Sequence, residues 1–172
     1  MIYLFTGHGK GKTTAALGQA LRAVGEGRAV LMFQFIKGPW KSGEDEAVKV
    51  FGDKFRIIKG GKGFVGILGD KLPRSVHRRA AQETWRRGKR ALQKREADIV
   101  IFDELNNALA LKLLAVGEVV RFLKRVKKNR EIIVTGRDAP KQLIAIADLV
   151  SEVREVKHYY RSGLLARRGI EF

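Results

Sequence analysis

The sequence predicts an α/β protein built on a mainly parallel sheet of about six strands. Two observations support this class. Short apolar runs rich in β-branched residues alternate with segments of helical periodicity, and the runs themselves show little polar alternation. Strands that are buried on both faces of a parallel sheet have this composition. Alternation of strand and helix favours a three-layer domain with right-handed crossovers.

Six apolar runs are the expected strands, at residues 2–5, 29–35, 55–58, 99–102, 132–135 and 149–153. The expected helices are residues 12–24, 44–51, 74–94, 116–128 and 140–147. Gly25 and Gly27 suit the end of the first helix, and Pro140 suits the start of the last. In the helix at 74–94, Trp85 and other residues at helical spacing predict one core face. His77 lies in the same basic segment and is expected to be a surface residue.

Length and composition favour a single domain over residues 1–172, large enough to bury a hydrophobic core. The chain has no cysteine, which excludes disulfides and thiolate metal sites. Its apolar stretches are far shorter than the roughly 20 residues that a membrane-spanning helix needs. The apolar N-terminus lacks the features of a signal peptide and is interpreted as a strand. We therefore expect a cytoplasmic protein with no membrane partner.

The chain is strongly basic, with 35 Lys and Arg against 18 Asp and Glu and a formal net charge of +17. Such a surface favours anionic partners, namely phosphates, nucleic acid or an acidic protein. A solvated basic surface without a partner is the alternative, because net charge specifies function only weakly.

Residues 6–14, Thr-Gly-His-Gly-Lys-Gly-Lys-Thr-Thr, follow an expected strand and open an expected helix. Glycines there allow successive backbone N–H groups to turn inward around phosphate oxygens, and the helix N-terminus adds partial positive charge. Lys12 supplies a full charge, and Thr13 can hold Mg²⁺. The standard phosphate-loop (P-loop) pattern has glycine where Thr6 stands, so the match is one residue short. The segment predicts a nucleoside triphosphate site in a P-loop, RecA-like fold.

Asp103 and Glu104 directly follow the apolar run at 99–102. Ligands bind at the carboxyl ends of strands in open α/β sheets, so this acidic pair is expected beside the phosphate loop. One of the two carboxylates can hold Mg²⁺, directly or through water, opposite Thr13. A helix cap or a solvated acid pair is the alternative.

Several segments together resemble the ATP:corrinoid adenosyltransferases that act in cobalamin biosynthesis and salvage. The phosphate loop is shared with many ATPases, whereas its combination with Gln-Phe-Ile-Lys-Gly at 34–38 and Val-Lys-His at 156–158 is far more specific. The family also has Thr at the Thr6 position. The resemblance covers the chain from its second residue to its last, with further matches at 20–25, 103–105, 135–137, 147–148, 150–152, Gly163 and 169–170.

The resemblance implies a transferase of the EC 2.5.1 type. The Co(I) of a reduced corrinoid attacks C5′ of ATP, and the whole triphosphate leaves from a nucleotide that lies reversed compared with ordinary P-loop ATPases. No general base is required, because the metal of the substrate is the nucleophile. The protein's part is then mainly positioning and electrostatic stabilisation.

Carried over to this chain, the resemblance assigns Lys12, Thr13 and Glu104 to catalysis, and Thr13, Asp103 and Glu104 to Mg²⁺. Phe64 falls where the family places an aromatic against the corrinoid, which helps to displace the lower axial ligand of the cobalt. Arg137 is expected to contact phosphate or a corrinoid side chain, with a structural ion pair as the alternative. The substrate-binding residues are then Gly7, His8, Gly9, Lys10, Gly11, Lys12, Thr13, Thr14, Phe64 and Arg137.

Two departures from the family concern how the corrinoid is held. Some members have Trp two positions after the aromatic that matches Phe64, whereas this chain has Gly66 in a longer, glycine-rich loop at 59–73. A loop anchor packed into the core is the alternative for Phe64. The better-known relatives also have a segment before the first strand that helps to cover the site, so we expect a more open site here or another element that closes it.

The expected partners are ATP, a corrinoid and, from the basic charge, an acidic flavin-containing electron donor. The resemblance adds a homodimer. Lys157 and His158 follow the last expected strand and are expected at the same edge of the sheet, or as solvated charges. A nucleic-acid-dependent P-loop ATPase and a small kinase are the competing functions. No nucleic-acid motif, stacking platform or acceptor lid is evident for either.

Overall fold

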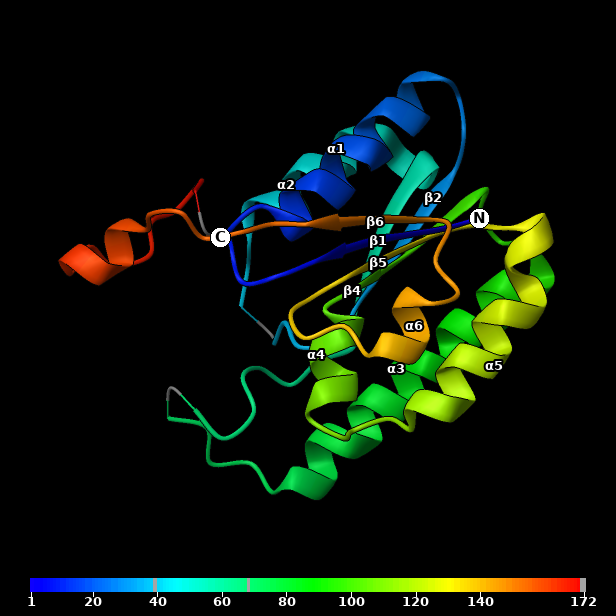
Figure 1. The fold of residues 1–172 in the computed structure, drawn as a ribbon. Coiled ribbons are helices and arrows are strands. Elements are labelled where there is room, and N and C mark those ends of the chain that lie inside the picture. The colour runs from blue at the N-terminus through cyan, green and yellow to red at the C-terminus, as the bar shows by residue number, and fades with distance from the viewer. Residues whose placement is uncertain (39, 68, 171–172) are drawn as a thin grey trace.

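The computed structural model describes residues 1–38, 40–67 and 69–170. Its centre is a six-stranded, all-parallel sheet with the strand order β3-β2-β4-β5-β1-β6 (Figure 1). The strands are β1 (Ile2–Thr6), β2 (Val30–Gln34), β3 (Phe55–Lys59), β4 (Ile99–Asp103), β5 (Glu131–Thr135) and β6 (Leu149–Glu152). One strand, β5, separates β1 from β4, as in RecA-like folds. The predicted fold class is therefore confirmed.

Helices cover both faces of the sheet and give the three layers visible in Figure 1. On one face lie α1 (Lys12–Gly25) and α2 (Gly43–Ala47), and on the other α3 (Arg74–Lys94), α4 (Leu105–Ala110), α5 (Val116–Val126) and α6 (Lys141–Ile144). The short 3₁₀ segments are Val48–Lys54, Lys127–Asn129 and Tyr159–Ser162.

Two apolar cores lie on either side of the sheet. Small residues of α1, among them Ala16 and Ala20, pack against β2, β4 and β5. Larger side chains of α3 and α5, such as Trp85 and Phe122, fill the opposite side. The predicted core face of α3 is confirmed, because Ala81, Thr84, Trp85, Gly88 and Leu92 are all buried.

The strand registers bring three loops to one edge of the sheet. Gln34 pairs with Asp103 at the ends of β2 and β4, and Phe5 pairs with Thr135 at the ends of β1 and β5. Because all strands run in parallel, their carboxyl ends and the loops that follow them meet at the same edge. The phosphate loop, the acidic pair and Arg137 therefore share one side of the molecule.

Some predicted boundaries were wrong. The helix predicted at 44–51 is the single turn of α2 followed by 3₁₀ turns, which Gly52 interrupts with a φ of 52°. The helices predicted at 116–128 and 140–147 end earlier, at Val126 and Ile144. The strands predicted at 29–35 and 149–153 are a residue or two shorter, and α4 was not predicted.

His77 was predicted to be a surface residue, and this prediction was wrong. Its side chain is buried, and its Nε2 lies 2.9 Å from Oδ2 of Asp70. Asp70 belongs to the glycine-rich loop before α3, so this loop contacts the first turn of that helix through His77.

Candidate active site

The phosphate loop connects the end of β1 to the first turn of α1. Gly7 and Gly11 have φ values of 95° and 121°, which side-chain-bearing residues rarely adopt. Lys12 is buried, and its Nζ donates to the carbonyl oxygen of Gly9 at 2.7 Å. Burial lowers the pKa of Lys12, although Glu104 opposes that effect. The Lys12 side chain therefore folds back onto the phosphate loop and is held there by the Gly9 carbonyl.

The C-terminal extension of β6 crosses the phosphate loop in close contact. The Gly9 amide donates to the Val153 carbonyl at 2.8 Å, and the Val153 amide donates to the Thr6 carbonyl at 2.8 Å. A Cβ placed on Gly7 would lie 2.5 Å from the Val153 oxygen, and one on Gly9 would lie 2.8 Å from Arg154. The crossing chain therefore leaves no room for a Cβ at Gly7 or Gly9, and Gly7 is favoured by its positive φ as well.

Asp103 is the centre of a buried hydrogen-bond network at the end of β4. Its Oδ1 accepts from Thr13 Oγ1 at 2.8 Å and from Thr135 Oγ1 at 2.7 Å, and its Oδ2 accepts from Gln34 Nε2 at 3.2 Å. Burial raises the pKa of Asp103, while the hydrogen bonds from Thr135 and Thr13 oppose that rise. The network joins the phosphate-loop helix to β2, β4 and β5.

Glu104 follows in a left-handed conformation, with a φ of 62°. Its amide donates to Thr135 Oγ1 at 2.9 Å, which fixes this turn at the start of α4. Burial, together with the negative charge of Asp103, raises the pKa of Glu104 to about 7. A strained, non-glycine residue that carries a perturbed carboxyl is typical of functional sites.

The residues present fit a magnesium ion. The Thr13 hydroxyl donates a hydrogen bond to Asp103, which leaves its oxygen lone pairs available for a cation, and Glu104 would add a hard carboxylate oxygen. Within the described residues no cluster of three or more His, Cys, Asp or Glu forms a metal cage. Mg²⁺ fits such a site, because it is bound through one or two carboxylates together with substrate phosphates and water.

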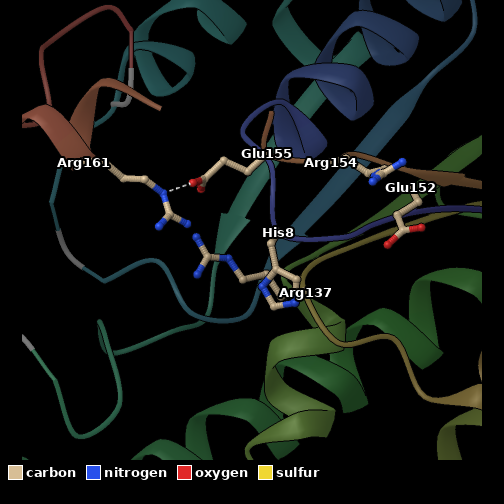
Figure 2. Close-up of a pocket in the computed structure, with 6 residues that line it drawn as sticks. All are labelled: His8, Arg137, Glu152, Arg154, Glu155 and Arg161. Carbon is tan, nitrogen blue, oxygen red and sulfur yellow. Dashed lines mark hydrogen bonds and ion pairs between the residues drawn. The ribbon is translucent and has the colours of Figure 1, made fainter. Parts of the chain in front are cut away.

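A polar cavity of about 440 Å³ lies beside the phosphate loop (Figure 2). It is lined by His8, Arg137, Glu152, Arg154, Glu155 and Arg161. Glu155 is paired with Arg161, and His8 Nε2 lies 3.3 Å from Oδ1 of Asp138. The Arg137 amide donates to Asn107 Oδ1 at 2.8 Å, so the start of α4 holds the backbone from which this guanidinium extends.

The other predicted residues lie around this core. Lys10 is exposed, and its Nζ donates to the carbonyl oxygen of Ile170 at 2.6 Å. Thr14 is exposed on the first turn of α1. Phe64 is 44% exposed, so the alternative of a loop anchor packed into the core is wrong. Lys157 lies exposed in the C-terminal tail, and His158 Nδ1 accepts from the Tyr160 amide.

Three residues that lie near the carboxylates of Asp103 and Glu104 were not predicted as part of the site. Gln34 and Thr135 bind Asp103, and Gln34 Nε2 also lies 3.4 Å from Glu44, which is paired with Lys37. The signal was available for Gln34 and Thr135, because each is a polar residue at the carboxyl end of an apolar strand. No comparable signal marked Glu44, which reaches the site from α2.

The fold and site together define a P-loop nucleotide-binding α/β protein. A crystal structure of the flagellar accessory protein FlaH from Methanocaldococcus jannaschii has a similar fold, with a TM-score of 0.54 and 13% identity. The similarity covers 88% of this chain and 69% of the FlaH chain.

The family assignment follows from the sequence of the whole chain. The model of the family ATP:corrinoid adenosyltransferase BtuR/CobO/CobP matches residues 1–172, and the chain belongs to this family. It is 39% identical to the corrinoid adenosyltransferase of Escherichia coli K12 and 38% identical to the corrinoid adenosyltransferase CobA of Salmonella typhimurium. Each alignment covers all of this chain and 85% of the relative. The predicted family resemblance is confirmed.

Proposed function

We propose that this protein transfers the 5′-deoxyadenosyl group of ATP to the Co(I) of a reduced corrinoid. In this reaction the electron pair of Co(I) forms the Co–C5′ bond, the C5′–O bond breaks, and inorganic triphosphate leaves. The match of the family model to residues 1–172, with an intact phosphate loop, carries the proposal. As the reaction consumes no proton at the nucleophile, the side chains serve to bind, align and stabilise charge.

The phosphate loop would hold the triphosphate that leaves. Its members are Gly7, His8, Gly9, Lys10, Gly11, Lys12, Thr13 and Thr14. Negative charge builds on this group as the C5′–O bond breaks, and the buried Lys12 ammonium lies in the loop that would surround it. Fixed positive charge at a developing anion lowers the barrier in a water-poor site. Because the Gly9 amide is engaged by Val153, the amides that follow it along the loop are the expected phosphate donors.

Thr13 and Glu104 would hold Mg²⁺, and Asp103 would orient the Thr13 hydroxyl by accepting its hydrogen bond. Bound Mg²⁺ would neutralise charge on the phosphate oxygens. The hydrogen bond from Thr13 to Asp103 supports this division of roles, since Asp103 already accepts three side-chain hydrogen bonds. Glu104, by contrast, is held at the site by its backbone, through the bond from its amide to Thr135.

Arg137 would contact either the triphosphate or a corrinoid side chain. Its positive charge acts to lower the pKa of both Lys12 and Glu104, which supports a place for it beside the phosphate loop and the acidic pair. It also lines the cavity of Figure 2 with His8. An Arg137→Lys variant would keep the charge but remove the planar guanidinium with its paired N–H donors. A loss of activity in this variant would indicate that Arg137 makes a bidentate contact.

The proposal includes an acidic, flavin-containing protein that reduces the corrinoid. Exposed cations on α3 and α5 support it, because these two helices pack together through Trp85 and Phe122. The exposed cations are Arg78, Arg79, Arg86, Arg87, Arg90, Arg121, Lys124 and Arg125. Complementary charge speeds encounter, and salt screens it. A reduction-coupled rate that does not change with ionic strength would contradict this partner.

A single domain over residues 1–172, a homodimer and a cytoplasmic location complete the proposal. Exposed apolar residues on the edge strand β6, Leu149 and Val150, support contact with a second copy. No helix in the described ranges has both the length and the apolar composition needed to cross a bilayer. Light scattering on the purified chain tests the dimer.

The decisive assay combines ATP, Mg²⁺ and cobalamin under strong reduction. The expected products are a light-sensitive adenosylcorrinoid and inorganic triphosphate in equal amounts. Formation of ADP without a corrinoid product would overturn the proposal. ATP turnover that depends on added nucleic acid would instead indicate the competing ATPase.

A further inference from the structure

We propose that Trp40 and Phe64 together form an aromatic wall against which one face of the corrinoid ring packs. This inference rests on the proposed function, which supplies the corrinoid as second substrate. It adds Trp40, from the loop after β2, to the single aromatic that the sequence assigned to this role.

The two rings lie against one another although they come from different loops. Their centroids are 5.9 Å apart with an interplanar angle of 32°, and Trp40 and Phe64 are 60% and 44% exposed. Ile67 and Leu72 of the same glycine-rich loop are also exposed. Clustered large apolar side chains on a surface mark a binding site more often than isolated ones do.

Glycines hold the Trp40 ring in place. A Cβ on Gly63 would lie 2.7 Å from Cη2 of Trp40, and one on Gly38 would lie 3.1 Å from Cζ3. Gly63 also has a φ of 104°, which other residues rarely adopt. The backbones of both loops therefore approach the edge of the indole, while the side chain as a whole stays exposed. This is the arrangement of an oriented binding surface, since a freely rotating side chain would need no such contacts.

The wall is attached to the strand end that carries the carboxylate network. The amides of Gly60 and Gly61 donate to the Gln34 carbonyl at 3.0 and 3.1 Å, and the Gly63 amide donates to the Ile36 carbonyl at 3.0 Å. The side chain of Gln34 in turn binds Asp103. Short covalent and hydrogen-bonded connections thus link the aromatic pair to the proposed nucleotide site.

Asp70 fixes the far end of the glycine-rich loop. Its carboxylate accepts from the amides of Gly66 at 2.9 Å and Leu72 at 3.0 Å, and it pairs with buried His77 at 2.9 Å. These backbone hydrogen bonds hold the pKa of Asp70 below its usual range. The segment that follows Phe64 is therefore attached to the first turns of α3.

The two sides of the phosphate loop offer different chemistry to the second substrate. On the β6 side, the cavity of Figure 2 is lined by arginines, glutamates and a histidine. On the β2 and β3 side are the exposed aromatic and aliphatic groups. The faces of a corrin macrocycle are flat, conjugated and largely apolar, so they match the aromatic side. Adenine is also flat, but two rings on separate loops with further exposed aliphatic groups offer more surface than one adenine covers.

The test compares Trp40→Ala, Trp40→Phe and Phe64→Ala with the wild-type enzyme in the adenosylation assay. Trp40→Ala is expected to raise the KM for cobalamin by about tenfold or more, because a contact centred on an aromatic anchor is lost. The KM for ATP should stay within about twofold of wild type, since the phosphate-loop contacts are untouched. Trp40→Phe should restore most of the affinity. Leu21→Ala, at an exposed apolar position on α1, is the matched control and should leave both constants unchanged.

The double variant Trp40→Ala/Phe64→Ala tests whether the rings act as one surface. If they do, its effect on the cobalamin KM is smaller than the product of the two single effects. Thermal melting shows whether each variant is folded.

Each outcome has a distinct meaning. Wild-type enzyme that forms no adenosylcorrinoid overturns the proposed function and the wall with it. An active wild type with an unchanged cobalamin KM in folded Trp40→Ala overturns the wall alone. A rise in the ATP KM in place of the cobalamin KM assigns the rings to adenine and also overturns it.

Discussion

Replacing Glu104 with Gln should stabilise the metal-free protein at alkaline pH. Burial and the neighbouring Asp103 raise the pKa of Glu104 from its ordinary 4.5 to about 7. The folded protein therefore holds this proton more tightly than the unfolded chain does. The contribution of Glu104 to the free energy of unfolding is therefore highest below pH 4.5. It falls as the pH rises from 4.5 to about 7, and it stays low at higher pH.

The magnitude follows from the same two pKa values. The difference between 4.5 and about 7 corresponds to roughly 3–4 kcal/mol, since each pKa unit is worth about 1.4 kcal/mol. Glu104→Gln carries no charge at any pH and avoids that cost. We expect the variant to be more stable than wild type by about 3–4 kcal/mol near pH 8, with little difference near pH 4.5.

Urea unfolding with excess EDTA and no nucleotide, followed by circular dichroism near the two pH values, measures this difference. Glu96→Gln, at an exposed position, reports the effect of removing one carboxylate from the surface. A gap between wild type and Glu104→Gln that is equal at both pH values would refute the reasoning. So would a wild type that is the more stable protein near pH 8.

Three other predictions concern the loop lysine, the packing of α3 and the glycine-rich loop. Lys12→Ala should lower kcat/KM for ATP by about 100-fold or more in steady-state kinetics, because a buried charge at the leaving group is removed; a loss below about fivefold would contradict its role. Gly88→Ala places a Cβ 2.3 Å from Phe102 and should cost about 1–3 kcal/mol in urea unfolding. Gly18→Ala, in the open on α1, should instead stabilise by about 0.5–1 kcal/mol. Asp70→Asn should speed hydrogen exchange at the amides of Gly66 and Leu72 by about tenfold; unchanged exchange would show that this carboxylate does not hold the loop.

The strands and the phosphate site were predictable because their signals are local. Each buried strand is a continuous apolar run, and the phosphate loop has its glycines, Lys12 and Thr13 within a few residues. The helix after residue 42 was harder, because the kink at Gly52 divides it. The helix α4 was not predicted, although a helix cap was the alternative for the acidic pair. Glu104 occupies the N-cap position of α4, in a left-handed conformation and without a side-chain capping hydrogen bond.

Contacts between distant segments account for the remaining errors. His77 was assigned to the surface because the charged residues around it dominate the local pattern, whereas its partner Asp70 lies across a loop. The pairing of Trp40 with Phe64 joins loops that follow two different strands. Contacts between distant segments depend on the order of the strands in the sheet, and a local sequence pattern carries no information about that order.

The crossing of the phosphate loop by the segment after β6 has a consequence for how the protein is synthesised. The phosphate loop leaves the ribosome before the two hydrogen-bonding neighbours of β1, which are β5 and β6. The contacts of Gly7 and Gly9 with Val153 must wait for that segment too. The ATP site is therefore completed only after β5, β6 and the segment that follows β6 have been synthesised. A nascent chain that stalls before residue 131 lacks both flanking strands of its phosphate loop.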